Sequence, residues 1–199
     1  MTIRKGEDWG VAEPVPADAR VVDSDRAAGE LAASHRRAGE PIPPMVLTGG
    51  DLARTLGGGR ADATTRSRVA IDLGAVLVDG RLHWFVAHLV ARRSWLRGRV
   101  VIAANAAFLG EWNIAPQAHP GDGRLDILDA DLSLGDRWKA RRRLPLGTHV
   151  PHPAIDVRRV EAIQIDLATP TPVRIDGHDI GAARALSIRV EPAALDVWI

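Results

Sequence analysis

The sequence predicts an α+β protein in which a short α/β N-terminal part precedes an antiparallel β-sandwich-like domain. Before residue 60, two stretches with helical spacing alternate with short apolar runs. After residue 61, short apolar runs follow one another between Asp-Gly and Pro turns, which is typical of sandwiches and barrels. We therefore expect two domains, at residues 1–60 and 61–199.

Composition narrows the class of protein. Hydrophobic residues make up 46% of the 199 residues, enough for a core, yet no run approaches the ~20 apolar residues of a membrane span. The N-terminus lacks the apolar segment of a signal peptide, and the absence of cysteine fits a cytoplasmic protein. A net charge of +1 argues against a nucleic-acid-binding surface.

The first helix is predicted over residues 25–38. Ala28, Leu31, Ala32 and His35 follow helical spacing. Asp23 or Ser24 can cap its start, because a side-chain oxygen there satisfies free N–H groups. Gly39 and Pro41 end it.

Shorter elements surround this helix. Residues 1–20 carry prolines and charges without periodicity, which predicts an extended lead-in. A short strand ending at Val21-Val22 and a second strand at Met45–Leu47 are expected on either side of the helix. A second helix begins at Asp51–Leu56 and ends at the Gly57–Gly59 run, which completes a β-α-β-α unit.

The second part of the chain is predicted to form a series of short strands. Asp79-Gly80 divides two strand-like runs and predicts a hairpin. Apolar residues alternate over 160–168 and 185–190, as expected of half-buried antiparallel strands. Only residues 133–144 look helical among these strands.

The segment from Asn105 to Ile127 has the most specific pattern. Gly121 and Gly123 permit backbone angles that other residues avoid, and they flank Asp122. Carboxylate and carbonyl oxygens here could converge on a hard cation such as magnesium or calcium, or on an anchoring hydrogen-bond network. The alternative is an ordinary Asp-Gly turn between two strands.

The start of the second helix is a candidate anion site. Thr48, Gly49, Gly50 and Asp51 stand between a strand and the helix. Free N–H groups and the helix dipole at such a position favour phosphate. The alternative is a plain strand-to-helix turn with a capping residue.

Two basic segments contain tryptophan. Such pairing fits an anionic membrane surface, because Trp favours the interface and cations favour the headgroups. It also fits RNA or another acidic surface, and a solvated helix face is an equally good explanation. The segments comprise Arg92, Arg93, Trp95, Arg97 and Arg99, and then Trp138, Lys139, Arg141, Arg142 and Arg143.

Two histidines form a candidate metal-binding pair. His149 and His152 are close in sequence, but zinc needs three or four ligands. The other candidates, His119 and His178, are distant along the chain. A Pro-rich loop is the better interpretation of this pair.

The order of several spaced motifs resembles the diacylglycerol kinase family of bacterial lipid kinases, chiefly its C-terminal β-rich domain. The resemblance covers most of the chain from Val21 onward. It rests on Ile71-Asp72-Leu73-Gly74, Asn105, Gly110, Ile114-Ala115-Pro116, Ala118, Asp122-Gly123-Arg124-Leu125-Asp126, Gly147-Thr148-His149, Ile175-Asp176-Gly177 and Val190–Leu195.

The resemblance implies roles for particular residues. Residues 47–57 look like the family segment beside the nucleotide, so Thr48, Gly49, Gly50 and Asp51 would border ATP. Asp176 and His178 match the family's Asp-Gly-Glu, with histidine at the position of the glutamate base. A structural Mg²⁺ would be held by Asp122 and by the carbonyl oxygens of His119 and Arg124.

The sequence also departs from the family. A Gly-Gly-Asp-Gly-Thr phosphate loop is expected near Val22–Ala27, and this stretch lacks its glycines and carries Asp23 and Asp25. We therefore expect the N-terminal nucleotide lobe to be a truncated remnant, and residues 86–100 to be shortened relative to the family.

Two functions follow from this comparison. The first is a divergent lipid kinase that transfers phosphate from ATP to a lipid hydroxyl with Mg²⁺. The alternative is a non-catalytic relative, a pseudoenzyme that binds a lipid or a protein. The expected partners are a lipid or anionic membrane surface and a second copy of the chain as a homodimer, at a cytoplasmic location with peripheral membrane contact.

Overall fold

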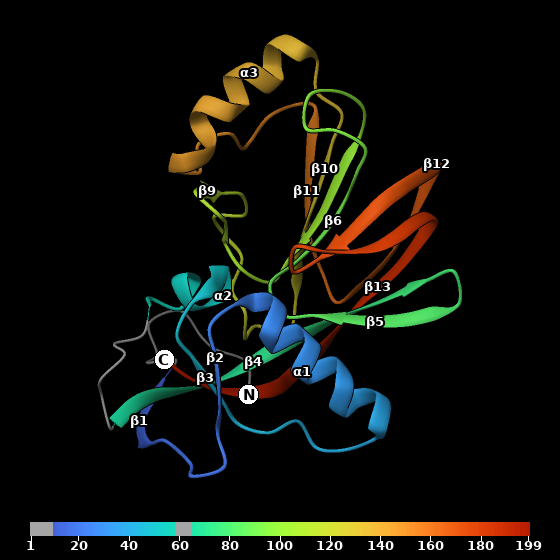
Figure 1. The fold of residues 1–199 in the computed structure, drawn as a ribbon. Helices are drawn as coiled ribbons and strands as arrows, with labels where there is room; N and C mark the ends of the chain where they lie inside the picture. The colour runs from blue at the N-terminus through green and yellow to red at the C-terminus, as the bar shows by residue number, and fades with distance from the viewer. Residues whose placement is uncertain (1–9, 59–64) are drawn as a thin grey trace.

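The computed structural model describes residues 10–58 and 65–199. Its helices cover two ends of a large, mostly antiparallel sheet (Figure 1). The elements are β1 Val11–Pro14, β2 Arg20–Val22, α1 Asp25–Ala38, β3 Met45–Leu47, α2 Gly50–Thr55, β4 Thr65–Val78, β5 Arg81–Phe85, β6 His88–Arg92, β7 Val100–Ala104, β8 Phe108–Leu109, β9 Trp112–Asn113, β10 Leu125–Ala130, α3 Leu134–Arg143, the 3₁₀ helix η1 Leu144–Leu146, β11 Ile155–Val160, β12 Ala162–Ile175 and β13 His178–Trp198.

The predicted β-α-β-α unit is present. Ser24 caps α1, because its Oγ accepts a hydrogen bond from the Ala27 amide at 3.3 Å. Gly39 ends the helix with a φ of 70°. Strands β2 and β3, on either side of α1, pair in parallel, and α2 starts one residue earlier than expected.

The extended lead-in needs a correction. Residues Val11–Pro14 form strand β1, which pairs antiparallel with β4, with Val11 opposite Arg68. Pro14 is tolerated because it lies at the end of an edge strand. Lack of periodicity hid this strand, since β1 is short and mostly exposed.

Over the described residues the main sheet runs β1-β4-β13-β12-β6-β7-β10-β11, with β5 beside β4 and with β3 and β2 continuing from β13. The predicted hairpin at Asp79-Gly80 joins β4 to β5, and both turn residues have positive φ. Irregularities in register bend β12 near Asp166 and β13 near Glu191.

Apolar side chains form three core clusters around these bent strands. One cluster lies between α1, α2 and β4 and includes Leu52 and Ile71. A second, around Phe85 and Ile188, is enclosed by the strands. A third, around Ile102 and Leu128, faces α3.

The predicted fold class is confirmed: a β-rich body carries a small α/β part. The predicted boundary between residues 60 and 61 falls outside the described residues. Strand β13 pairs with β12 along its first half and with β3 at its end, so one strand contacts both parts. The division into two domains stays a prediction.

Candidate functional site

The tip of the β12–β13 hairpin carries Asp176, a predicted catalytic residue. Its φ is 46°, and its carboxylate turns back into the molecule. The carboxylate accepts hydrogen bonds from the backbone amides of Val86 at 2.8 Å, Ala87 at 2.9 Å and His88 at 3.0 Å. Val86 and Ala87 lie between β5 and β6, and His88 is the first residue of β6. Asp176 therefore joins two turns that are far apart in the sequence.

Helix α1 covers this carboxylate. A Cβ added to Gly29 would lie 2.6 Å from Asp176 Oδ2, so glycine allows the close approach of the helix. Burial raises the pKa of Asp176 to about 7, the Asp25 carboxylate adds to this rise, and the three amides oppose it. A carboxyl group with a pKa near 7 can change its charge near neutral pH.

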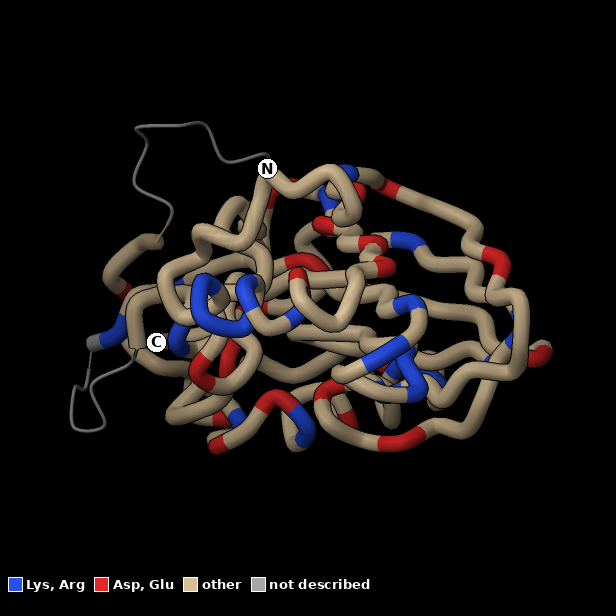
Figure 2. Tube along the Cα trace, turned by 90° about the horizontal axis from the view of Figure 1, so that it is seen from above, with Lys and Arg blue, Asp and Glu red and all other residues tan. Residues whose placement is uncertain are grey.

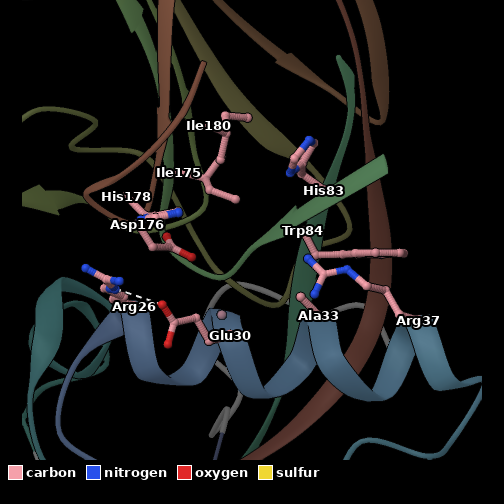
Figure 3. Close-up of a pocket in the computed structure, with 11 residues that line it drawn as sticks. Arg26, Glu30, Ala33, Arg37, His83, Trp84, Ile175, Asp176, His178 and Ile180 are labelled. Atoms are coloured by element: carbon pink, nitrogen blue, oxygen red, sulfur yellow. Dashed lines mark hydrogen bonds and ion pairs between the residues drawn. The ribbon is translucent and has the colours of Figure 1, made fainter. Parts of the chain in front are cut away.

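Asp176 and His178 both line a pocket of about 350 Å³ between α1 and the hairpin tip (Figure 3). Arg26 and Arg37 bring positive charge to this pocket, and Glu30 pairs with Arg26 at 2.8 Å. Burial lowers the pKa of the His83 imidazole, and Arg37, Arg81 and His178 lower it further. The structure thus brings the two predicted catalytic residues together in one pocket, which is lined by both basic and acidic side chains.

The predicted nucleotide-binding residues lie at the start of α2. There the carboxylate of Asp25, from the same chain, accepts hydrogen bonds from backbone amides of the helix. Asp25 accepts hydrogen bonds from the Asp51 amide at 2.6 Å and from the Leu52 amide at 3.0 Å. Burial raises the pKa of Asp25, and these two amides oppose the rise. Thr48 donates from its backbone amide and its hydroxyl to the Val22 carbonyl, at 2.9 and 3.1 Å.

Both predicted glycines are required by this arrangement. Gly50 has a φ of 97°, and a Cβ there would overlap the Asp25 carboxylate. A Cβ at Gly49 would overlap the Asp23 carbonyl. The glycines therefore admit residues 23–25 of the same chain, at the place where the sequence predicted a phosphate.

Asp51 links α2 to the segment that follows Asn105. Its carboxylate accepts a hydrogen bond from the Gly110 amide at 2.9 Å, and Arg54 donates to the Gly110 carbonyl at 2.6 Å. His88 is buried beside them and contacts the Ala106 carbonyl at 3.0 Å. Burial lowers the pKa of His88 to about 4, so its ring is neutral at physiological pH.

Asp72 holds the Asp-Gly loop, and its role was missed at the level of sequence. Its carboxylate accepts hydrogen bonds from the Gly123 amide at 2.7 Å and from the Ala193 amide at 2.8 Å. Its own amide donates to the Pro120 carbonyl at 2.6 Å, and Asn105 Nδ2 donates to the Asp72 carbonyl at 2.8 Å. An acidic residue within an apolar strand was the available signal.

Asp122, the predicted magnesium ligand, contacts Arg159 of β11. One Asp122 oxygen pairs with Arg159 Nη2, and the other accepts the Arg124 amide at 3.1 Å. Arg159 Nε also lies 3.6 Å from buried Asp126. Burial raises the pKa of Asp126 to about 6, and the Arg159 charge opposes this rise.

No histidine in the described chain belongs to a metal-ligand cluster, since no three His, Cys, Asp or Glu residues there are grouped to hold an ion. His149 is buried and contacts the Ile114 carbonyl at 3.1 Å. His152 Nδ1 accepts the Ala154 amide at 3.1 Å. His119 Nδ1 accepts the Gly121 amide at 3.3 Å. Each of these histidines thus has its own backbone partner, and the loop interpretation of His149 and His152 stays a prediction.

The two basic–aromatic segments meet at an apolar groove of about 430 Å³ beneath α3. Trp95 stacks edge-on against Trp112 with ring centroids 5.3 Å apart. Arg92 lies over Trp95 at 4.2 Å, and Arg141 lies over Trp112 at 5.5 Å. The lining includes Trp95, Leu96, Ile102, Trp112, Leu128, Leu134, Trp138, Arg137, Arg141 and Leu144.

Helix α3, wholly within the described chain, buries none of its residues. Trp138 is 62% exposed and Leu134 70% exposed. Its last turn carries Arg141, Arg142 and Arg143. Segments of Lys and Arg and segments of Asp and Glu are interspersed over the trace in Figure 2.

The fold and these sites define a β-rich body with a small α/β part. The family model described as "YegS C-terminal NAD kinase beta sandwich-like domain" matches residues 75–199. This match covers more than half of the sequence, and the chain therefore belongs to that family. Comparison with curated protein sequences gives no match.

Solved structures agree on the fold. A candidate diacylglycerol kinase from Bacillus anthracis str. Sterne aligns over 90% of this chain and 77% of its own, with a TM-score of 0.66 and 14% identity. A diacylglycerol kinase from the same strain aligns over 90% of this chain and 75% of its own, with a TM-score of 0.61 and 15% identity. The predicted resemblance to diacylglycerol kinases is thus confirmed for the fold. Within residues 10–58 and 65–199, no helix could span a membrane.

Proposed function

We propose that this protein binds an anionic single-chain amphiphile at a membrane surface, as a non-catalytic member of its family. The groove beneath α3 carries the proposal. Its volume of about 430 Å³ falls within the ~300–1,000 Å³ typical of small-molecule sites. Its lining is mainly apolar, which suits an acyl chain, and Arg141 supplies positive charge for a headgroup. Arg137 is instead bonded within the chain, because it donates to the carbonyls of Leu132, Trp95 and Gly98.

The rim of the groove supports contact with a bilayer. Leu96, Leu134, Trp138 and Leu146 are exposed apolar side chains near α3. The basic residues of α3 outnumber its single aspartate, and each basic residue near an anionic surface contributes about 1 kcal/mol. Trp at such a rim favours the interface between water and lipid.

Vesicle binding tests the membrane contact. Changing Arg141, Arg142 and Arg143 to Ala should weaken co-sedimentation with phosphatidylglycerol vesicles by at least ~10-fold, because about 3 kcal/mol of attraction is removed before screening. A matched control changes Arg20, Arg174 and Arg184, which are exposed residues of the strands. Equal losses in both variants would indicate general charge attraction and contradict a docking role for α3.

A groove variant tests chain binding separately. Ala130 lines the groove, and Ala130→Trp places an indole within it. We expect loss of fluorescent fatty-acid binding with an unchanged vesicle affinity. Retained fatty-acid binding would argue against the groove as the acyl site. Circular dichroism checks that both variants remain folded.

ATP-dependent phosphoryl transfer is the second candidate. The pocket that joins Asp176, His178 and Arg26 favours it, because transfer to a hydroxyl needs an acceptor base and cationic groups. The Asp25 carboxylate at the α2 amides argues against it, since it places negative charge where phosphate would bind. ATP and Mg²⁺ are therefore ligands of this protein only under this second candidate function.

Calorimetric titration with Mg-ATP and a non-hydrolysable analogue separates the two candidates. We expect no saturable binding at millimolar nucleotide. Saturable binding that Gly49→Asp abolishes would instead favour a working kinase. Vesicle binding is measured on the same sample, so that loss of fold is distinguished from absence of a nucleotide site.

A further inference from the structure

We infer that the guanidinium of Arg159 takes the position of a divalent cation at the Asp-Gly loop and holds this loop without a metal. The resemblance to the lipid kinases implied a magnesium ion held by Asp122 and by the carbonyl oxygens of His119 and Arg124. The structure places a cationic side chain of this chain against the same carboxylate.

The position of Arg159 follows from the pairing of β10 with β11. Asp126 is directly opposite Arg159 in the register of these antiparallel strands. Neighbouring side chains on one face of such a pair are close enough to interact. Arg159 Nε is 3.6 Å from Asp126 Oδ1, and Nη2 reaches Asp122 Oδ2, so one guanidinium bridges two carboxylates.

The environment makes a positive partner necessary. The Asp126 side chain is 3% exposed and that of Asp122 16% exposed, whereas Arg159 retains 37% exposure. Two carboxylates with so little water repel one another and need a cation between them. The planar guanidinium suits this task, because its fork of donors can contact two oxygens at fixed angles.

The same contacts leave Asp122 unsuited to magnesium. Magnesium needs near-octahedral oxygen ligands at about 2.0–2.1 Å. One Asp122 oxygen accepts the Arg124 amide, and the other faces Arg159. The residues present therefore fit a resident arginine better than a resident ion.

The loop has a second attachment that is independent of the arginine. Asp72 accepts the Gly123 amide and donates its own amide to the Pro120 carbonyl. Arg159 thus fixes one side of the loop from β11, and Asp72 fixes the other from β4. Removing Arg159 should loosen the loop and free the Asp122 and Asp126 carboxylates without unfolding the protein.

Thermal unfolding in EDTA and in millimolar MgCl₂ tests the inference. The natural chain should unfold at the same midpoint in both. Arg159→Ala should lose about 2–6 °C in EDTA, from the effect that weakening one ion-pair network has on a domain of this size. MgCl₂ should restore part of that loss, because a divalent ion can then occupy the freed carboxylates.

Arg158→Ala is the matched control, because Arg158 neighbours Arg159 in β11 but pairs with exposed Asp156. It should show no magnesium response. If Arg159→Ala fails to fold, Arg159→Lys keeps the charge without the fork and should show a smaller loss. A midpoint of the natural chain that falls in EDTA would overturn the inference. So would an Arg159→Ala midpoint that is unchanged in EDTA or that magnesium does not restore.

Discussion

Asp176 shows how a single side chain gains its properties from distant partners. Its position on a hairpin tip was predictable from Asp176-Gly177, which is a turn signal. Its three amide partners come from residues 86–88, which no local pattern connects to the hairpin. Because the carboxylate satisfies these amides, it stabilises the junction of two turns whether or not it also acts in chemistry.

The raised pKa of Asp176 predicts a pH dependence of stability. The carboxyl titrates at about 7 when folded and at about 3.9 when unfolded. The folded state therefore binds the extra proton between these values, so the free energy of unfolding falls as pH rises from about 4 to about 7. Urea titrations at several pH values should show a smaller fall for Asp176→Asn, which cannot ionise.

The buried carboxyls of Asp25, Asp72 and Asp126 also have raised pKa values, so part of the fall will persist. Asp179→Asn, an exposed change in the same hairpin, serves as the control. An identical pH profile for Asp176→Asn and the natural chain would contradict the raised pKa of Asp176.

At the scale of elements, α2 depends on the close approach of residues 23–25. We expect Gly50→Ala to lower the free energy of unfolding by about 1–3 kcal/mol, because it combines a φ of 97° with overlap of Asp25. Gly58 also has a positive φ, of 71°, but a Cβ added there would have no atom within 4 Å. Gly58→Ala should therefore lower the free energy of unfolding by ~1 kcal/mol or less. Urea unfolding measures both. Equal losses would show that backbone strain alone, not the Asp25 contact, explains glycine at position 50.

The helices differ in how firmly they are attached. α1 buries Ala28, Gly29, Ala32 and Ala33, whereas α3, every residue of which is described, buries none. Local opening is easier where few apolar groups are buried. Amide hydrogen exchange should therefore be at least ~10-fold faster in α3 than in the central turns of α1. Comparable protection in the two helices would contradict α3 as a loosely held cover of the groove.

At the scale of the whole molecule, the sequence predicted most elements but not how they meet. Ser24, Gly39 and Asp79-Gly80 carry local signals, so the first helix and the first hairpin were predictable. The groove was not predictable, because it joins Trp95 to α3 through tertiary packing. The contact of the Asp25 carboxylate with the amides of α2 was also not predictable. The sequence shows Asp25 only as a departure from the family pattern.

The arrangement of β13 predicts that the α/β part and the β-rich part unfold together. Strand β13 pairs with β12, β4 and β3 in turn, and α1 covers a core cluster that contains Ile71 and Trp84 of the body. A chain that begins at Thr65 lacks β1, β2, α1, β3 and α2, so this cluster would face water.

Such a shortened chain should lose the cooperative thermal transition of the full protein and bind a hydrophobic dye, as expected when apolar surface is exposed. The full chain should unfold in a single transition by far-UV circular dichroism and by tryptophan fluorescence. A shortened chain with a sharp transition near the midpoint of the full protein would instead support two independent domains. Because β13 runs through both parts without a break, we expect the cooperative outcome.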